Sequence, residues 1–216
     1  YLRWYDFVHP APQLLDEAVY GLVELNRPRI PPARLVANPG CYPTGAILAL
    51  APVVKEGLIE PDIIIDCKSG VSGAGRTLSM DLHFAEANEN VYAYALEGHR
   101  HLPEIIQELG GLNPALSPSI TFVPHLVPMT RGILSSCYAN LLEGKVESSE
   151  KGKKELVELY RDFYRGEPFI RITEVPPQTK QTWGNNLCLI HPTIDIRTGR
   201  LIVISCIDNL VKGAAG

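Results

Sequence analysis

Residues 34–54 read RLVANPGCYPTGAILALAPVV, and this stretch decides how the rest of the fold is interpreted. The apolar run at 34–37 predicts a short strand, which the Asn-Pro-Gly sequence at 38–40 ends in a tight turn. Apolar residues then recur with helical spacing over 44–54, so a helix is expected to follow. A strand therefore passes directly into a helix, and Cys41 lies at the junction.

Further strands and helices are predicted on the C-terminal side of this junction. Strands are predicted at 62–67, 91–96, 120–129 and 133–142, helices at about 103–109 and 149–164, and a hairpin from strands 186–196 and 200–208. This series predicts a fold that mixes helix and strand.

Composition restricts the class of protein. The 216 residues are 45% hydrophobic and 20% charged and carry a formal net charge of −4, which is ordinary for a globular protein. No apolar stretch approaches the roughly 18 residues of a spanning helix and the chain starts without a leader, so we expect a cytoplasmic protein. With 20 Lys plus Arg against 24 Asp plus Glu, nucleic acid and membranes are poor partners, and a small molecule is the expected one.

Cys41 is the candidate nucleophile. At a helix N-terminus, unpaired N–H groups and the helix dipole favour the thiolate, which is the reactive form of cysteine. The chain has five cysteines and no CxxC pair, which predicts reduced thiols rather than a disulfide framework or a zinc ribbon. The other four lie in or at the end of apolar runs and are expected to be ordinary core residues: Cys67, Cys137, Cys188 and Cys206.

The sequence GHRHLPE at 98–104 supplies the candidate proton-transfer groups. His99 and His101 are the best partners for a cysteine nucleophile, because imidazole titrates near neutral pH. In an extended segment these two side chains point the same way, so together with Glu104 they form an alternative candidate metal site. No third histidine or second carboxylate lies nearby at ligand spacing, and we predict no metal.

The sequence SGVSGAGR at 69–76 has the composition of a loop that binds an anion. Its small residues expose backbone N–H groups to a phosphate or carboxylate, and Arg76 adds a fixed positive charge. The glycines are spaced G-x-x-G-x-G and not G-x-G-x-x-G, so the loop is not the fingerprint of a dinucleotide-binding domain.

Five motifs in this order resemble the N-acetyl-gamma-glutamyl-phosphate reductase family of arginine biosynthesis. They are NPGCYPTGA, SGVSGAGR, GHRHLPEI, PHLVPMTRGIL and DNLVKGAAG. The resemblance covers nearly the whole chain and extends in plan to aspartate-semialdehyde dehydrogenase. It implies an α+β fold, with a mixed, largely antiparallel sheet and helices on one face, as in the C-terminal catalytic domain of semialdehyde dehydrogenases.

The resemblance also implies the roles of individual residues. It makes Cys41 the nucleophile and His99 the acid/base. Substrate contacts are implied for Arg76, His101 and Glu104. The residues implied on the nicotinamide side of the cofactor are Ser69, Gly70, Ser72, Gly73 and Asn209.

The domain organisation is inferred from the same resemblance. Family members have an N-terminal Rossmann domain for NADP, and this sequence lacks its glycine fingerprint, so we expect a piece of a longer protein with most of the NADP site outside it. Residues 1–37 are interpreted as the tail of that domain. Residues 38–206 form the catalytic and oligomerisation domain, and 207–216 start a helix that returns to the nucleotide domain. A homo-oligomer is expected.

The implied reaction is the NADPH-dependent reduction of N-acetyl-gamma-glutamyl phosphate to N-acetyl-glutamate semialdehyde, with release of phosphate, through a thioester on Cys41. Two alternatives remain open at this point. One is a related reductase of lysine biosynthesis that acts on a carrier-linked aminoadipyl phosphate. The other is a non-catalytic module, which either keeps a dead site or binds metal through its HRH sequence.

Overall fold

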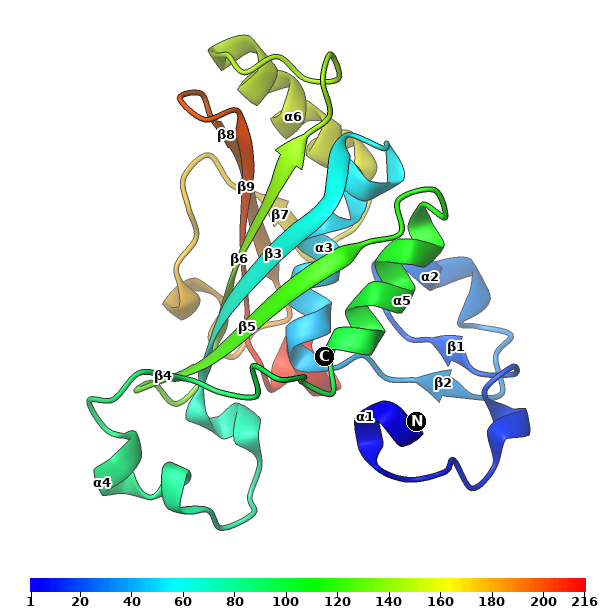
Figure 1. Cartoon of the computed structure of the whole chain (residues 1–216), viewed down its shortest axis with the longest axis vertical. Coiled ribbons are helices and arrows are strands. Elements are labelled where there is room, and N and C mark those ends of the chain that lie inside the picture. The colour runs from blue at the N-terminus through cyan, green and yellow to red at the C-terminus, as the bar shows by residue number, and fades with distance from the viewer.

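A seven-stranded sheet forms the centre of the molecule in the computed structural model, which describes all residues 1–216 (Figure 1). The strands lie in the order β4-β5-β3-β6-β9-β8-β7. Their bounds are β3 Ile59–Gly70, β4 Tyr92–Ala93, β5 Ser119–Val127, β6 Ile133–Leu141, β7 Ile170–Ile172, β8 Cys188–Asp195 and β9 Arg200–Ile207. Only β3–β5 and β7–β8 pair in parallel, and the other four neighbouring pairs are antiparallel.

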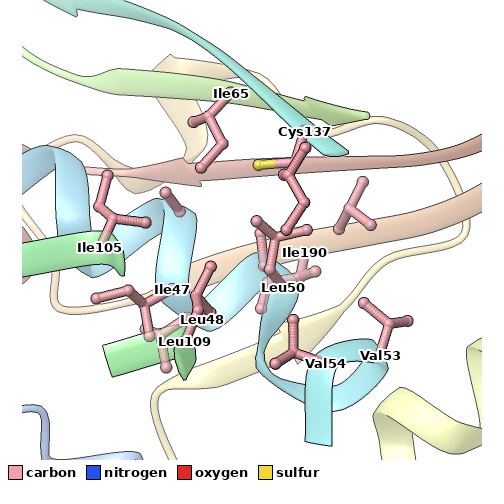
Figure 2. Packing of buried hydrophobic residues seen from close by; sticks show 14 of the residues in the cluster. Ile47, Leu48, Leu50, Val53, Val54, Ile65, Ile105, Leu109, Cys137 and Ile190 are labelled. Carbon is pink, nitrogen blue, oxygen red and sulfur yellow. The ribbon is translucent and has the colours of Figure 1, made fainter. Parts of the chain in front are cut away.

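Three long helices pack on one face of this sheet. They are α3 Cys41–Lys55, α5 Leu102–Leu112 and α6 Glu150–Phe163, and residues from all three join the inward-facing side chains of the strands in one core. Figure 2 shows how Ile65, Cys137 and Ile190 of the sheet meet Ile47 and Leu50 of α3. The expected α+β fold, with a largely antiparallel sheet and helices on one face, is therefore confirmed.

Helix α3 is the centre of the core. Every residue from Tyr42 to Val54 is buried, because the sheet covers one side of the helix while α5 and α6 flank it. A helix that is apolar all round belongs in such a buried position. The helix begins at Cys41, three residues before the start predicted from the apolar spacing, so the cysteine is the first helical residue.

The N-terminal segment is a separate small layer beside α5 (Figure 1). Its elements are α1 Leu2–Tyr5, β1 Val19–Tyr20, α2 Val23–Asn26 and β2 Val36–Ala37, with short 3₁₀ turns at Pro12–Leu14 and Arg27–Arg29. β1 and β2 pair in parallel, and β2 leads directly into the turn before α3.

A long connection joins β3 to α5 and projects from the edge of the sheet near β4 (Figure 1). It contains 3₁₀ turns at Val71–Ala74 and Met80–Leu82 and the short helix α4 Phe84–Ala87. None of its residues between 71 and 101 is buried. After β8 and β9 the chain ends in a π-helical turn, Val211–Ala215, and a further 3₁₀ turn, Thr179–Thr182, precedes β8. None of the helices is both long and apolar enough to cross a bilayer.

Candidate active site

A cavity of about 360 Å³ opens at the N-terminus of α3. Four parts of the chain line it: the start of α3, the end of β3 with the long connection, the segment before α5, and β5. The lining residues are Cys41, Tyr42, Ser69, Gly73, Ala74, Thr77, Ser79, Asp81, Leu82, Tyr92, Tyr94, His99, Arg100, His101 and Leu126. The cavity therefore brings the predicted nucleophile and the predicted acid/base to one place.

Cys41 is half-buried at the first position of α3, next to the N-cap residue Gly40. Burial raises the pKa of its thiol, while the backbone N–H groups of Tyr42 and of Cys41 itself lower that pKa by a smaller amount. The helix N-terminus thus favours the thiolate as expected, but desolvation outweighs it. In this structure the sulfur is a thiol at neutral pH. The other four cysteines are buried, as predicted.

His99 is held among aromatic rings. The rings of Tyr42, Tyr94 and Phe122 lie edge-on to it, with centroids 5.4 to 5.6 Å away. Its Nδ1 accepts a hydrogen bond from the backbone N–H of His101 at 3.1 Å, so the neutral ring carries its proton on Nε2. Burial, and then the charge of Arg100, lower the pKa of His99 to about 4. At neutral pH this imidazole is a hydrogen-bond donor through Nε2.

His101 lines the same cavity and packs against the turn that carries the cysteine. A Cβ atom at Gly40 would lie 2.6 Å from Nε2 of His101, so any larger residue there would require this ring to move. Nδ1 of His101 is buried and has no hydrogen-bond partner. Burial, followed by the charges of His99 and Arg100, lowers the pKa of His101 to about 3.

Glu104 lies behind the cavity wall and is not among the residues that line it. Its Oε1 accepts a hydrogen bond from the hydroxyl of Tyr20 at 2.6 Å and another from the backbone N–H of Gly40 at 2.7 Å. The carboxylate therefore supports the turn before Cys41.

The residues predicted on the cofactor side cluster beside the cavity. Ser69 and Gly73 line it. The amide of Asn209 joins this cluster, because Nδ2 donates to Oγ of Ser72 at 3.0 Å and Oδ1 accepts from the N–H of Gly132 at 2.7 Å. Gly70 lies close to the chain opposite: its N–H donates to the carbonyl of Gly132 at 2.9 Å, and a Cβ at this position would lie 2.8 Å from the backbone of Thr130 and Arg131.

Arg76 is exposed on the long connection and does not line the cavity. The lining cation is Arg100, which the sequence places between the two histidines of the HRH motif. An anion bound in this cavity would therefore face the positive charge of Arg100, which the sequence analysis did not select.

Sequence reading also missed the three tyrosines of the cavity, Tyr42, Tyr92 and Tyr94. Tyr94 donates a hydrogen bond to the hydroxyl of Tyr42 at 3.0 Å, which in turn donates to the carbonyl of His125 at 3.1 Å. Tyr92 and Tyr94 both line the cavity, and their spacing of two residues in VYAYAL would have indicated a shared face.

No three His, Cys, Asp or Glu side chains come together as a metal site anywhere in the chain. Glu104 is hydrogen-bonded to Tyr20 and Gly40, so it does not complete a ligand set with the two histidines. The geometry gives the metal-binding alternative no support.

The lowered pKa values of the two histidines make the fold sensitive to acid. Free imidazole titrates near 6.5, but the folded state binds these protons only near pH 4 and pH 3. Below pH 6.5 the unfolded chain therefore holds more protons, so stability that is present above pH 6.5 is lost as the pH falls toward 4. We expect Tm to fall by at least about 5 °C over this range in thermal scans. His101→Asn should flatten the profile, and an unchanged acid slope in this variant would contradict the assignment.

Residues 41–209 match the family model described as semialdehyde dehydrogenase, dimerisation domain. The whole chain is similar to N-acetyl-gamma-glutamyl-phosphate reductases, with 57% identity to that of Dehalococcoides mccartyi, 54% to that of Heliobacterium modesticaldum and 50% to that of Geobacillus kaustophilus. It spans 62% of the length of each of these relatives.

Solved structures share the fold at low sequence identity. A probable aspartate-semialdehyde dehydrogenase from Pseudomonas aeruginosa superimposes with a TM-score of 0.68 at 16% identity, over 96% of this chain and 66% of its own. Aspartate semialdehyde dehydrogenase II from Vibrio cholerae gives a TM-score of 0.67 at 16% identity, over 93% of this chain and 65% of its own.

Proposed function

Because the chain belongs to the semialdehyde dehydrogenase family, through a dimerisation domain at residues 41–209, we propose that it carries the catalytic cysteine of an N-acetyl-gamma-glutamyl-phosphate reductase of arginine biosynthesis. The observation that carries the proposal is that Cys41, at the start of a buried helix, and His99, fifty-eight positions later, line one cavity. The reduced cysteines fit an enzyme that acts in the cytoplasm.

The first step is attack of the Cys41 sulfur on the carbonyl carbon of the acyl phosphate. A carbon–sulfur bond forms, the bond from carbon to the phosphate oxygen breaks, and the products are a thioester and inorganic phosphate. His99 and His101 are weak bases, with pKa values of about 4 and 3, so the thiol proton passes to the departing phosphate. Arg100, on the cavity wall, stabilises the charge of that phosphate.

The second step reduces the thioester, for which bound NADPH supplies the hydride. The residues of this chain that would hold the nicotinamide side of the cofactor are Ser69, Gly70, Ser72, Gly73 and Asn209. Two of these residues, Ser69 and Gly73, line the cavity beside Cys41, and Gly73 places no side chain there.

In both steps the carbonyl oxygen gains negative charge, and Nε2–H of neutral His99 donates a hydrogen bond to it. In place of the acid/base role expected for His99, we therefore propose that its neutral imidazole donates a hydrogen bond and does not transfer a proton. In the first step this oxyanion collapses with loss of phosphate; in the second it collapses with cleavage of the carbon–sulfur bond, which gives the aldehyde and a Cys41 thiolate that takes a proton from water. His101 is proposed to contact the substrate, since its unpartnered Nδ1 belongs to a ring on the cavity wall.

We also propose that the enzyme is a homo-oligomer, assembled through the face of the sheet that the helices leave uncovered. On β9, Leu201 and Val203 point into the core, so Ile202 and Ile204 lie on the uncovered face. The family description as a dimerisation domain supports this use of the face. Sedimentation of the full-length protein measures it.

Substrate assays and thiol labelling of the full-length protein test the proposed function. We expect NADPH oxidation and phosphate release in equal amounts from N-acetyl-gamma-glutamyl phosphate, and no turnover of a carrier-linked aminoadipyl phosphate. Iodoacetamide should label Cys41 and not the four buried cysteines. The acyl phosphate should protect Cys41 from this labelling. Full turnover by protein alkylated at Cys41 would overturn the proposal, and so would preference for the aminoadipyl substrate.

A further inference from the structure

Tyr20 is held beside the catalytic turn by the small parallel sheet of β1 and β2. It pairs with Ala37 in the strand register, and the N–H of Gly21 donates to the carbonyl of Ala37 at 2.8 Å. Ala37 is the last residue of β2, only four positions before Cys41. The pairing thus fixes where the Tyr20 side chain starts, relative to the turn.

The Tyr20 hydroxyl reaches the same carboxylate oxygen that holds Gly40. Oε1 of Glu104 accepts from this hydroxyl at 2.6 Å and from the N–H of Gly40 at 2.7 Å. These three residues come from β1, the first turn of α5 and the N-cap of α3. A single oxygen therefore joins three separate parts of the chain directly behind the cysteine.

Both polar groups of the Gly40 backbone are thereby fixed. Its N–H is bound by Glu104, and its carbonyl accepts from the backbone N–H of Thr44 at 3.0 Å and from Oγ1 of Thr44 at 2.9 Å. The ring of His101 lies against its Cα, where a Cβ atom would be 2.6 Å from Nε2 of His101. The Cα of Cys41, and with it the direction of the sulfur, is set by this residue.

Loss of the hydroxyl would leave Glu104 poorly satisfied. The carboxylate is half-buried, and burial raises its pKa, while the hydrogen bonds from Tyr20 and Gly40 lower it. Without Tyr20 the carboxylate keeps one of these two donors and is free to rotate. A charged acceptor that has lost a donor takes up a proton more readily, so its grip on Gly40 weakens.

We propose that Tyr20 is a positioning residue for the Cys41 nucleophile, acting through the Glu104 carboxylate and the Gly40 peptide. This rests on the proposed role of Cys41. It also gives Glu104 a different task from the substrate contact that the family resemblance implies. Neither Tyr20 nor Glu104 lines the cavity, so their effect is on the geometry of attack and not on substrate binding.

The test is Tyr20→Phe in the full-length protein, compared with Tyr160→Phe. Tyr160 is a matched control because its hydroxyl also donates to α3, at the carbonyl of Ala49, and neither residue lines the cavity. We expect Tyr20→Phe to lower kcat and the rate of Cys41 alkylation by iodoacetamide about 10-fold, with KM changed less than about 2-fold. Tyr160→Phe should lower Tm and leave the alkylation rate unchanged.

A pair of substitutions at Glu104 provides the second arm, and it decides the matter if Tyr20→Phe does not fold. Glu104→Gln keeps an oxygen that accepts from Gly40, so it should alkylate within about 3-fold of wild type, whereas Glu104→Ala should be at least about 10-fold slower. A ¹³C titration of the Glu104 carboxyl should show a raised pKa in Tyr20→Phe.

Three results would overturn the proposal: wild-type alkylation in Tyr20→Phe, equal slowing in the two tyrosine variants, or equal rates in Glu104→Gln and Glu104→Ala. Failure of the proposed function gives a different pattern. In that case Cys41→Ser stays active as a reductase, while the alkylation rate of Cys41 still responds to Tyr20.

Discussion

Cys41→Ser in the full-length protein is expected to lower reductase turnover by at least about 10⁴-fold. A serine hydroxyl holds its proton far more tightly than a thiol and needs a general base to attack an acyl phosphate. The two imidazoles that line the cavity with Cys41 are weak bases. The pKa of His99 is about 4, and its Nδ1 is occupied by the N–H of His101. The pKa of His101 is about 3.

Stopped-flow measurement of NADPH oxidation, with phosphate release recorded in parallel, checks this expectation. The matched control is Cys206→Ser. Cys206 is buried in β9, and its thiol makes one hydrogen bond, to the carbonyl of Pro177. This control should keep turnover within about 2-fold of wild type, since it is remote from the reacting atoms. Near-normal turnover in Cys41→Ser would remove the thioester from the mechanism.

The position of Cys41 was predictable because its signals are local. A short apolar run, an Asn-Pro-Gly turn and a helical pattern follow one another in one stretch of chain, and each has its own physical cause. The one difference is that helix α3 begins at Cys41, three residues before its predicted start. Its partner His99 came from a second local motif, and the family resemblance joined the two. The cavity agrees with that pairing.

The predicted boundaries of β3 were wrong for a physical reason. Ser69 and Gly70 have loop composition, but they pair with Leu126 and Val127 of β5, and Ser69 also pairs with Ile133 of β6. A ladder on both sides overrides local propensity. The predicted strand at 91–96 shrinks to two residues, because it is an edge strand paired only with β5.

Tyr20 lay beyond sequence reasoning altogether. Its strand β1 has only two residues, too few for a periodic pattern, and its hydrogen-bond partner Glu104 is 84 positions away. Glu104 was selected for its place beside the histidines, but the direction of its side chain depends on where α5 begins and on what lies opposite. Only the packed chain decides between a carboxylate that faces a substrate and one that faces a backbone amide.

Glu24→Ala is expected to lower the free energy of unfolding by about 3 to 5 kcal/mol. Glu24, on α2, forms an ion pair with Lys212 of the C-terminal turn, and the side chains are 2% and 6% exposed. The lysine ammonium also lies 5.9 Å from the ring centroid of Phe169. Removing the carboxylate leaves a buried ammonium without a counter-charge, which costs far more than the pair contributes when intact.

A double variant distinguishes the loss of the ion pair from the cost of a buried, unpaired charge. Glu24→Leu with Lys212→Met replaces both charges by apolar groups of similar volume, so it should recover most of the stability lost in Glu24→Ala. Glu155→Ala is the exposed control, because its partner Lys151 is 76% exposed, and Tm should change by less than about 1 °C. Chemical denaturation of each variant gives the free energies. Equal losses in Glu24→Ala and in the double variant would show that the site needs the charges themselves.

The residue after Lys212, Gly213, packs so closely on Cys41 that a Cβ there would lie 2.9 Å from the cysteine Cβ. Release of Lys212 should therefore loosen the backing of the nucleophile, and alkylation of Cys41 should slow in Glu24→Ala and recover in the double variant.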